Sequence, residues 1–360
     1  MSNNPLRTSV EDLFKKYDLD ALWIKSLPVI KYLANFTGST ANLLITSDGK
    51  KHLNVDSRYT TQAKEECTVD SVKEITRPID DLGEMAKEFG IKRLGFESTK
   101  ASFSEHRTLS KIMNGNEMVP VDDNLMNLRI VKTEDELTKL RTANEIAQKA
   151  FAEMVNELHV GWTEKEAAWF LEKRFREYGG SGLSFDTLVC SGPRSAIVHG
   201  KPSDRAFKEG EFIIVDRGLF ANHFASDETN TFVLGKADAK HKEIYQIVKD
   251  AHDRCVDGVK PGVKCSDLDA LAREYIHDKG YGEYFGHGTG HGVGLEVHEM
   301  PVISPRGDGY LEEGMVFSIE PGIYIPEFGG VRIEDVVAVT ADGCEVLTLA
   351  DKTKFEIPLK

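Results

Sequence analysis

Short apolar runs separated by turn residues fill the front part of the chain. They predict β-strands, with a turn at Asp48-Gly49 between the second and the third, over residues 19–24, 43–46, 53–55 and 94–96. Before the last of these runs, apolar residues recur with helical spacing over residues 82–89, and Gly90 ends this predicted helix. The pattern indicates a small α/β domain over residues 1–127.

From residue 128 onward, long helical patterns precede glycine-rich, strand-forming stretches, and this order occurs twice. Capping-box patterns at Thr133 and at Thr163 predict the starts of two amphipathic helices. Further along, Ser266 is expected to cap a similar helix. The repeat indicates either a weak internal duplication, whose halves commonly place a site where they meet, or a chance likeness between ordinary helices. We expect an α+β domain over residues 128–360.

Two aspartates lie in a predicted β-hairpin over residues 211–235, where apolar runs flank a turn. A turn centred on Ala221 and Asn222 would place Asp216 opposite Asp227 on one face. Like charges that face each other across strands repel, so a cation between them is one explanation. A hydrated acidic face on an exposed hairpin is the other.

Two glutamates repeat this arrangement in the segment 317–340. A connection centred on Glu327 would place Glu320 opposite Glu334 in buried-looking strands, where unpaired carboxylates are costly unless a partner or a metal compensates them. Two such carboxylate pairs and one imidazole suit two divalent ions of the Mn, Co or Zn kind.

Three histidines stand in the glycine-rich stretch 286–301, namely His287, His291 and His298. Glycines there let backbone and side chains approach a bound group closely. The helical zinc motif His-Glu-x-x-His is absent, because His298-Glu299 is not followed by a histidine at position 302. A metal would therefore be held on strands and loops.

Composition excludes several function classes. The formal net charge of −14 over 360 residues disfavours nucleic-acid binding. No stretch approaches the roughly 20 apolar residues of a membrane helix, and the start of the chain lacks the pattern of an export signal, so we expect no membrane association. Five cysteines without a Cys-x-x-Cys motif argue against a disulfide framework and a thiolate zinc site, which fits a cytoplasmic protein.

Five motifs occur in a fixed order, VDRG, SDETNTF, GHGVGLEVHE, EPGIY and RIED, and they carry Asp216, Asp227, His291, Glu320 and Glu334. In this order they resemble the pita-bread (creatinase-like) metallopeptidases, and within these the aminopeptidase P and prolidase group. The front segments YLANFTGSTANLLITSDG and DSRYT resemble, more loosely, the small amino-terminal domain of that group. The resemblance implies a creatinase-like α/β domain followed by a pita-bread catalytic domain with a pseudo-twofold duplication.

The resemblance also implies a role for each of the five motif residues. Asp216 would hold the first of two metal ions, with manganese the best candidate and cobalt or zinc the alternatives. Asp227 and Glu334 would bridge both ions, and His291 with Glu320 would complete the second site. A hydroxide between the ions would attack the peptide carbonyl, with Glu320 as the proton shuttle.

Five further residues match positions that contact the substrate or orient the ligands in this family. His298 would hydrogen-bond the substrate carbonyl or the oxyanion, and His199 would be a second substrate contact. The substrate pocket and the support of the ligands would involve His287, Tyr324 and Arg332.

One position departs from the family pattern. The run after the bridging aspartate usually contains arginine where this chain has Asn230, so an ion pair that arginine makes there is expected to be missing.

The implied activity is that of an Xaa-Pro aminopeptidase, which cleaves between a first residue and a following proline in small peptides. An Xaa-Pro dipeptidase (prolidase) is the alternative with the same site, and Arg306 is the nearest candidate in the sequence to hold a free carboxylate. A non-catalytic peptide-binding relative or a metal-free creatinase-like hydrolase is disfavoured, because all five ligand positions are kept. The resemblance further implies a homodimer.

Overall fold

The computed structural model describes residues 4, 6–122 and 124–359. Contacts between residues divide the chain into two units, one of residues 7–129 and one that contains residues 130 onward together with Leu6. Among the described residues, no helix combines the length and apolar character that crossing a membrane requires. The five cysteines are free thiols.

The front unit is a six-stranded sheet in the order β4-β3-β2-β1-β5-β6 with helices on both faces. In chain order its elements are α1 (Val10–Tyr17), β1 (Ala21–Ile24), α2 (Leu27–Ala34), β2 (Ala41–Thr46), β3 (Lys51–Val55), α3 (Thr60–Glu66), β4 (Ser71–Glu74), α4 (Pro78–Glu88), β5 (Arg93–Glu97), α5 (Phe103–Met113), β6 (Glu117–Val121) and the 3₁₀ turn η1 (Leu125–Arg129).

Strand β1 shows why this unit buries both faces of its sheet. Successive strand residues point to opposite faces, and Trp23 packs with α4 and α5 while Leu22 and Ile24 pack with α1 and α2. The predicted strands and the predicted helix of this unit are confirmed. The sequence pattern missed α1, α2, α3, β4, α5 and β6.

The second unit repeats one order of elements, two helices followed by strands. The first half contains α6 (Glu134–Glu157), α7 (Glu164–Glu177), β7 (Gly182–Leu183), β8 (Leu188–Ser191), the turn η2 (Gly192–Ala196), β9 (Phe212–Arg217), β10 (Leu219–Ala221), β11 (Phe224–Ala225) and β12 (Glu228–Leu234). The second half contains α8 (Ala239–Gly258), α9 (Cys265–Asp278), the turn η3 (Gly282–Tyr284), β13 (Gly290–Gly292), β14 (Glu299–Ile303), β15 (Val316–Ile319), β16 (Gly322–Ile325), β17 (Gly329–Arg332), β18 (Asp335–Val339), β19 (Cys344–Val346) and β20 (Glu356–Ile357).

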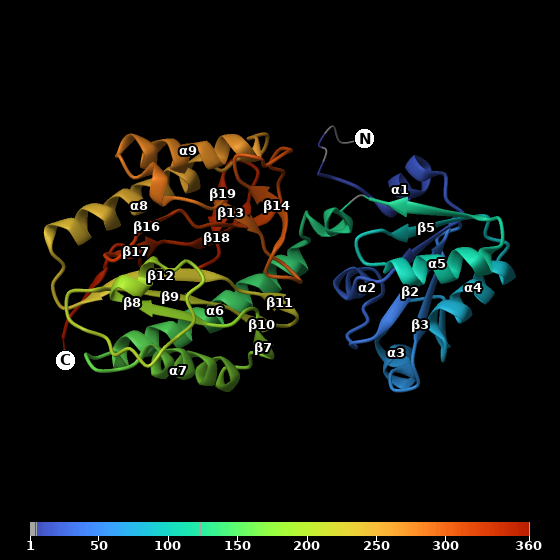
Figure 1. Cartoon of the computed structure of the whole chain (residues 1–360), viewed down its shortest axis with the longest axis horizontal. Coiled ribbons are helices and arrows are strands. Elements are labelled where there is room, and N and C mark those ends of the chain that lie inside the picture. The colour runs from blue at the N-terminus through green and yellow to red at the C-terminus, as the bar shows by residue number, and fades with distance from the viewer. Residues whose placement is uncertain (1–3, 5, 123, 360) are drawn as a thin grey trace. The chain divides into compact units, whose positions relative to one another are not determined.

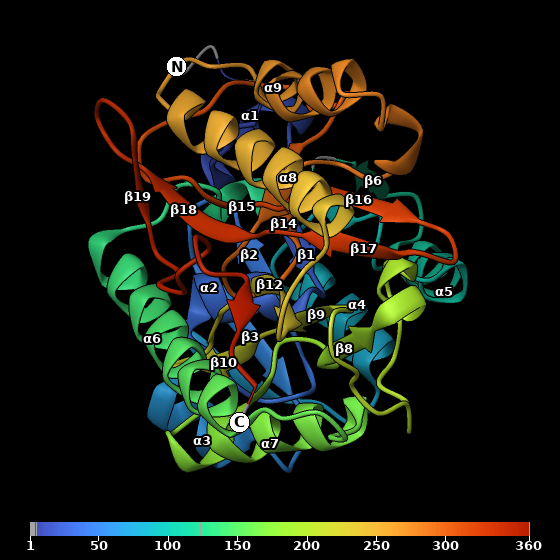
Figure 2. The same ribbon diagram turned by 90° about the vertical axis from the view of Figure 1, so that its left-hand side faces the viewer.

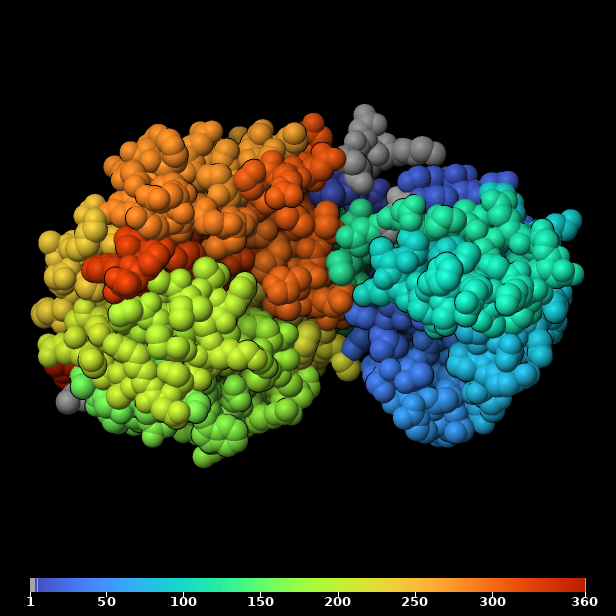
Figure 3. Space-filling model, viewed as in Figure 1, coloured from blue at the N-terminus to red at the C-terminus, as the bar shows by residue number. Residues whose placement is uncertain are grey.

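The strands of this unit lie between two layers of helices, α6 and α7 on one side and α8 and α9 on the other (Figures 1 and 2). The two larger sheets have the orders β20-β12-β9-β8 and β14-β13-β15-β18-β19, and two smaller sheets have the orders β11-β10-β7 and β16-β17. The space-filling view shows segments of both halves, coloured yellow-green and orange-red, meeting at the surface of the unit (Figure 3). Residues far apart in the sequence are thereby brought to one place between the sheets.

Two of the three predicted helix caps are confirmed. Thr133 and Thr163 each form a capping box at the start of α6 and α7. The prediction that Ser266 caps a helix is wrong, because α9 begins at Cys265 and its N-cap, Lys264, makes no side-chain cap bond. A backbone bridge from Lys264 to Tyr310 takes the place of a side-chain cap.

The first predicted hairpin is present, but its register differs from the prediction. The turn lies at Asn222 and His223, which both have positive φ values of 48° and 71°, as a tight two-residue hairpin turn requires. Asp216 therefore faces Thr229 across the ladder, and the prediction that it faces Asp227 is wrong. A turn displaced by one residue shifts the pairing by two, which keeps each side chain on its predicted face.

The second hairpin has the predicted register. Ile319 pairs with Asp335 on one side of the glutamates and Gly322 pairs with Arg332 on the other. Glu320 and Glu334 themselves lie in the break between these two ladders, where the Glu320 N–H donates to the Thr289 carbonyl and the Glu334 N–H donates to the Thr229 carbonyl.

Candidate active site

A cavity of about 480 Å³ opens between the two sheets of the second unit. Residues of both halves line it, and they include nine of the ten residues predicted for the site: His199, Asp216, Asp227, His287, His291, His298, Glu320, Arg332 and Glu334. The tenth, Tyr324, lies behind this lining and hydrogen-bonds to His287 and Arg332. The structure thus brings together every residue that the sequence predicted for the site.

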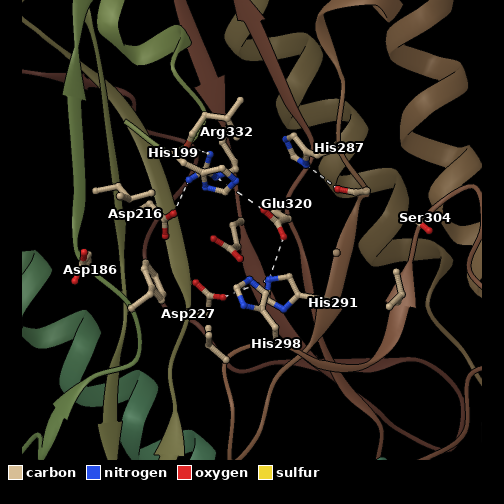
Figure 4. Close-up of a pocket in the computed structure, with 18 of the residues that line it drawn as sticks. Asp186, His199, Asp216, Asp227, His287, His291, His298, Ser304, Glu320 and Arg332 are labelled. Atoms are coloured by element: carbon tan, nitrogen blue, oxygen red, sulfur yellow. Dashed lines mark hydrogen bonds and ion pairs between the residues drawn. The ribbon is translucent and has the colours of Figure 1, made fainter. Parts of the chain in front are cut away.

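Asp216, Asp227, His291 and Glu320 converge from the two sheets (Figure 4), and Glu334 lines the same cavity. Asp216 and Asp227 belong to the β9–β12 hairpin, whereas His291, Glu320 and Glu334 come from β13 and the ends of β15 and β18. Ligand atoms of Asp227, His291 and Glu334 all lie within 4.8 Å of one another. The His291 Nε2 atom is 3.3 Å from Glu320 Oε1 and 3.6 Å from Asp227 Oδ2.

Asp216 has one oxygen paired and one without a partner. Its Oδ2 accepts a 2.5 Å bond from Arg332 Nη2, while its buried Oδ1 has no hydrogen-bond partner among the described residues. Burial raises the pKa of Asp216, although the Arg332 charge opposes this rise. A buried oxygen without a donor is costly, so this atom suits coordination to a cation.

Asp227 and Glu334 repel each other in the buried cluster. Burial raises the pKa of each carboxyl well above its usual value, and the negative charges of neighbouring carboxylates raise it further. A divalent cation would remove this cost, because it favours the ionised form of both groups.

Glu320 and His291 form an ion pair. Burial opposes the charge on each group, but their mutual hydrogen bond and attraction prevail, lowering the pKa of Glu320 to about 2 and raising that of His291 to about 9. A metal ion bound by the imidazole nitrogen would displace this proton. Carboxylate oxygens with one imidazole nitrogen form a donor set that fits Mn, Co or Zn.

Arg332 and Thr229 hold the carboxylates from behind. The Thr229 hydroxyl donates a 2.6 Å bond to Glu334 Oε2 and accepts a 3.0 Å bond from Arg332 Nε. The sequence analysis did not single out Thr229. Thr229 lies two residues after Asp227, and residues two apart in extended chain point to the same face. This spacing could have identified Thr229 as a site residue.

Tyr324 links Arg332 to His287. Arg332 Nη1 donates to the Tyr324 oxygen at 3.0 Å, and that oxygen lies 2.9 Å from His287 Nε2. Burial raises the pKa of Tyr324 to about 12 and lowers that of His287, so the hydroxyl keeps its proton and the imidazole is neutral. The Tyr324 hydroxyl then donates to His287 Nε2, and His287 Nδ1 donates to the Gly288 carbonyl at 2.8 Å.

His298 and His199 both line the cavity and are both exposed to solvent. The ring of His298 lies 4.3 Å from that of His291, centroid to centroid. Partial burial and then the charge of His291 lower the pKa of His298, which leaves it neutral near pH 7. A neutral imidazole carries one N–H that it can donate.

A buried cation, Arg217, lies beside Asn230. The Asn230 Oδ1 atom accepts a 2.8 Å bond from Arg217 Nη1, and Arg217 Nη2 pairs with Glu228 at 2.6 Å. Asn230 itself, being uncharged, makes a hydrogen bond and no ion pair, while the neighbouring strand supplies the guanidinium of Arg217, which pairs with Glu228. Arg306 does not line the cavity, whereas Lys201, which the sequence analysis had not considered, does.

Two family models match the chain. The model of metallopeptidase family M24 matches residues 138–341, and the model of the creatinase/prolidase N-terminal domain matches residues 7–131. The Xaa-Pro dipeptidase of Pyrococcus furiosus is 38% identical over 350 residues, which cover 96% of this chain and 99% of that protein.

Solved structures match over the same extent. The Xaa-Pro dipeptidase from Bacillus anthracis superposes with a TM-score of 0.92 at 38% identity, covering 96% of this chain and 98% of that one. The X-Pro aminopeptidase from Thermotoga maritima MSB8 gives a TM-score of 0.87 at 39% identity, covering 96% and 99%. These matches confirm the predicted fold class, and the family implies divalent metal ions at the site. The chain belongs to metallopeptidase family M24 and carries a creatinase/prolidase N-terminal domain in front of its peptidase domain.

Proposed function

We propose that this chain is a metal-dependent Xaa-Pro peptidase, which hydrolyses the bond between a first residue and a following proline. The observation that carries the proposal is the convergence of Asp216, Asp227, His291, Glu320 and Glu334 at one cavity. The similarity to proteins named Xaa-Pro dipeptidase and X-Pro aminopeptidase supports the choice of substrate.

In this proposal Asp216, Asp227, His291, Glu320 and Glu334 would hold two divalent ions, manganese in preference to cobalt or zinc. Ions held there would supply Lewis-acid chemistry, polarising the scissile carbonyl and making a water nucleophilic near neutral pH. The unpartnered Asp216 Oδ1 and the repulsion between Asp227 and Glu334 support this assignment.

Glu320 moves the proton. Its carboxylate lines the cavity where the attacking water and the leaving nitrogen must both lie. It accepts the water proton and returns it to the proline nitrogen, which must gain one proton when the C–N bond breaks.

His298 and His199 act on the substrate. A neutral His298 donates its N–H to the carbonyl oxygen as negative charge develops there, and a preorganised donor of this kind stabilises the transition state more than the ground state. His199, on the same cavity, contacts the peptide and holds it in line.

Substrate length separates two forms of this function. The name of the P. furiosus relative favours dipeptides, whose free carboxylate needs a cation. Of the described residues that line the cavity, Lys201 and Arg332 have cationic side chains, and Arg332 is engaged with Asp216. Lys201 lies 3.3 Å from Asp186, and the side chains of both are more than three-quarters exposed. The names of several relatives, Xaa-Pro dipeptidase or prolidase, support the dipeptidase form, and the X-Pro aminopeptidase from T. maritima supports the aminopeptidase form, in which longer peptides also fit.

Three substrates test the proposal and separate the two forms: Ala-Pro, its C-terminal amide, and Ala-Pro-Ala. Each is offered to chelated enzyme before and after addition of Mn, Co or Zn. We expect hydrolysis only with metal, and an aminopeptidase to accept all three. A dipeptidase would prefer free Ala-Pro, and Lys201→Met would remove this preference if Lys201 holds the carboxylate. Equal turnover by metal-free enzyme, or no hydrolysis of any of the three, would refute the proposal.

The remaining parts of the proposal concern the whole molecule. We place the functional boundary at residues 127 and 128, with the peptidase chemistry behind it, and we propose a homodimer in the cytoplasm. The free thiols support a reducing compartment. Light scattering of the purified chain tests the dimer.

A further inference from the structure

Three residues that directly follow candidate metal ligands are charged and buried. Arg217 follows Asp216, Glu228 follows Asp227, and Asp335 follows Glu334, and the exposed fractions of the three are 0%, 1% and 7%. Neighbouring residues of a strand point to opposite faces. The ligands line the cavity, whereas these three followers do not, so the charges lie behind the site.

Lys352 joins these charges from the C-terminal segment. Its Nζ donates to Glu228 Oε1 and to Asp335 Oδ1, and its residue is 7% exposed. Arg217 binds the other oxygen of Glu228 at 2.6 Å. We call Arg217, Glu228, Asp335 and Lys352 the rear ionic layer. It contains two cations and two anions, so its charges balance.

The rear ionic layer is tied to its surroundings by further contacts. The Thr348 hydroxyl donates to Asp335 Oδ1, and His252 Nε2 lies 3.1 Å from Asp335 Oδ2. The Lys352 carbonyl accepts a 2.8 Å bond from the Tyr245 hydroxyl, which fixes the backbone that carries the ammonium. A charge held at both its head and its backbone has little freedom to move.

Lys352 connects the two sheets that supply the metal ligands. Glu228 begins β12 in one sheet and Asp335 begins β18 in the other (Figure 1). Their chain neighbours Asp227 and Glu334 are the two carboxylates assigned to both ions, and their carboxylate oxygens lie within 4.8 Å of each other, so their like charges repel. The repulsion between Asp227 and Glu334 therefore tends to separate the two sheets. Lys352 joins the same two sheets on the side that faces away from the cavity.

We propose that the rear ionic layer positions Asp227 and Glu334 for metal binding, with Lys352 as the positioning residue that couples the two sheets. The inference rests on the proposed function, since it assumes that these carboxylates bind divalent ions. Lys352 acts through Glu228 and Asp335 and touches neither metal nor substrate.

The test compares Lys352→Met with a matched control, Arg141→Met. Arg141 makes a two-pronged ion pair with Glu345, at 2.8 and 2.7 Å, in the same unit, but Glu345 neighbours no candidate ligand. Affinity for Co²⁺ is measured by calorimetry on the chelated full-length chain, together with the visible absorption spectrum of the bound Co²⁺ and the thermal unfolding temperature.

We expect Lys352→Met to weaken Co²⁺ binding about tenfold or more and to alter the spectrum, because residues that support ligands typically have effects of this size. Lys352→Arg, which keeps the charge, restores part of the affinity. Arg141→Met lowers the unfolding temperature while its Co²⁺ affinity and spectrum stay unchanged. Thr348→Val removes only the hydroxyl that donates to Asp335, so we expect it to weaken Co²⁺ binding several-fold. This variant provides the test if Lys352→Met does not fold.

Unchanged Co²⁺ affinity and spectrum in Thr348→Val and in a folded Lys352→Met would overturn the inference, as would an equal loss of affinity in Arg141→Met. Failure of the unaltered chain to bind Co²⁺ would overturn the proposed function and the inference together. The unaltered chain therefore distinguishes the two failures.

Discussion

Thr229→Val tests whether the hydroxyl behind Glu334 prepares the site for metal. Valine has nearly the shape of threonine but lacks the hydroxyl, so the change removes the 2.6 Å bond to Glu334 and leaves Arg332 Nε without its acceptor. A hydrogen bond to a charged group contributes about 1.5–3 kcal/mol. Burial raises the pKa of Glu334 in the metal-free chain, and a metal ionises it, so the bond is stronger in the metal-bound state. Since about 1.4 kcal/mol is a factor of ten in an equilibrium constant, its loss weakens metal binding by up to roughly 10–100-fold.

The assay is calorimetric titration of the chelated chain with Co²⁺ or Mn²⁺, beside Thr231→Val as a matched control. Thr231 lies two residues along the same strand, is equally buried, and exchanges hydrogen bonds of 2.8 and 3.0 Å with the Arg332 backbone, so it touches no candidate ligand. Both variants should lose stability, and Thr229→Val alone should show the large loss of affinity. Unaltered metal affinity in Thr229→Val, or an equal loss in both variants, would refute the reasoning.

Three further predictions follow from the site. His298→Ala should keep its metal but lose about 10²–10³ in kcat, because one oxyanion donor has an effect of that size; loss of metal from this variant would instead make His298 a ligand. The metal-free chain should lose stability as the pH rises from 6.5 to 9. The pKa of His291 is raised from 6.5 to about 9, so the ion pair with Glu320 stabilises the fold only while the imidazole keeps its proton. Thermal unfolding across this pH range, with and without Mn²⁺, would measure the loss. An Xaa-Ala substrate should be cleaved tenfold or more slowly than Xaa-Pro, because an apolar slot that fits the ring discriminates by about 1–3 kcal/mol, and equal rates would point to a broader aminopeptidase.

The two hairpins show how far local patterns determine a site. Around Glu327 the positive φ of 64° falls where the sequence centres the turn, so the predicted register holds for the strands on either side of Glu320 and Glu334. In the first hairpin the left-handed pair is Asn222 and His223, and histidine is not a residue that usually marks such a turn. The error in the turn position shifted the cross-strand pairing of the hairpin by two residues. A shift of two keeps each side chain on its predicted face, so Asp216 and Asp227 still line the cavity together.

Contacts between distant segments are what local patterns leave out. The helix α9 begins without a side-chain cap because a segment some forty residues later, at Tyr310, pairs with the backbone of Lys264. No property of Ser266 or its neighbours indicates this partner, because a capping rule considers residues within one helical turn. The same limit applies to Thr229, whose partner Glu334 comes from the other sheet.

The sequence pattern can predict three charges of the rear ionic layer, but it cannot identify the fourth. If Asp216, Asp227 and Glu334 face a metal, the period of two in a strand places Arg217, Glu228 and Asp335 on the opposite side, where apolar neighbours make unpaired charge costly. One cation and two anions leave a negative charge, so this pattern already requires a further cation from another element. Lys352 meets that requirement through Glu228 and Asp335, but it lies in a polar segment near the end of the chain, where a lysine ordinarily faces solvent. Charge balance predicts that such a residue exists, and only the fold determines which residue it is.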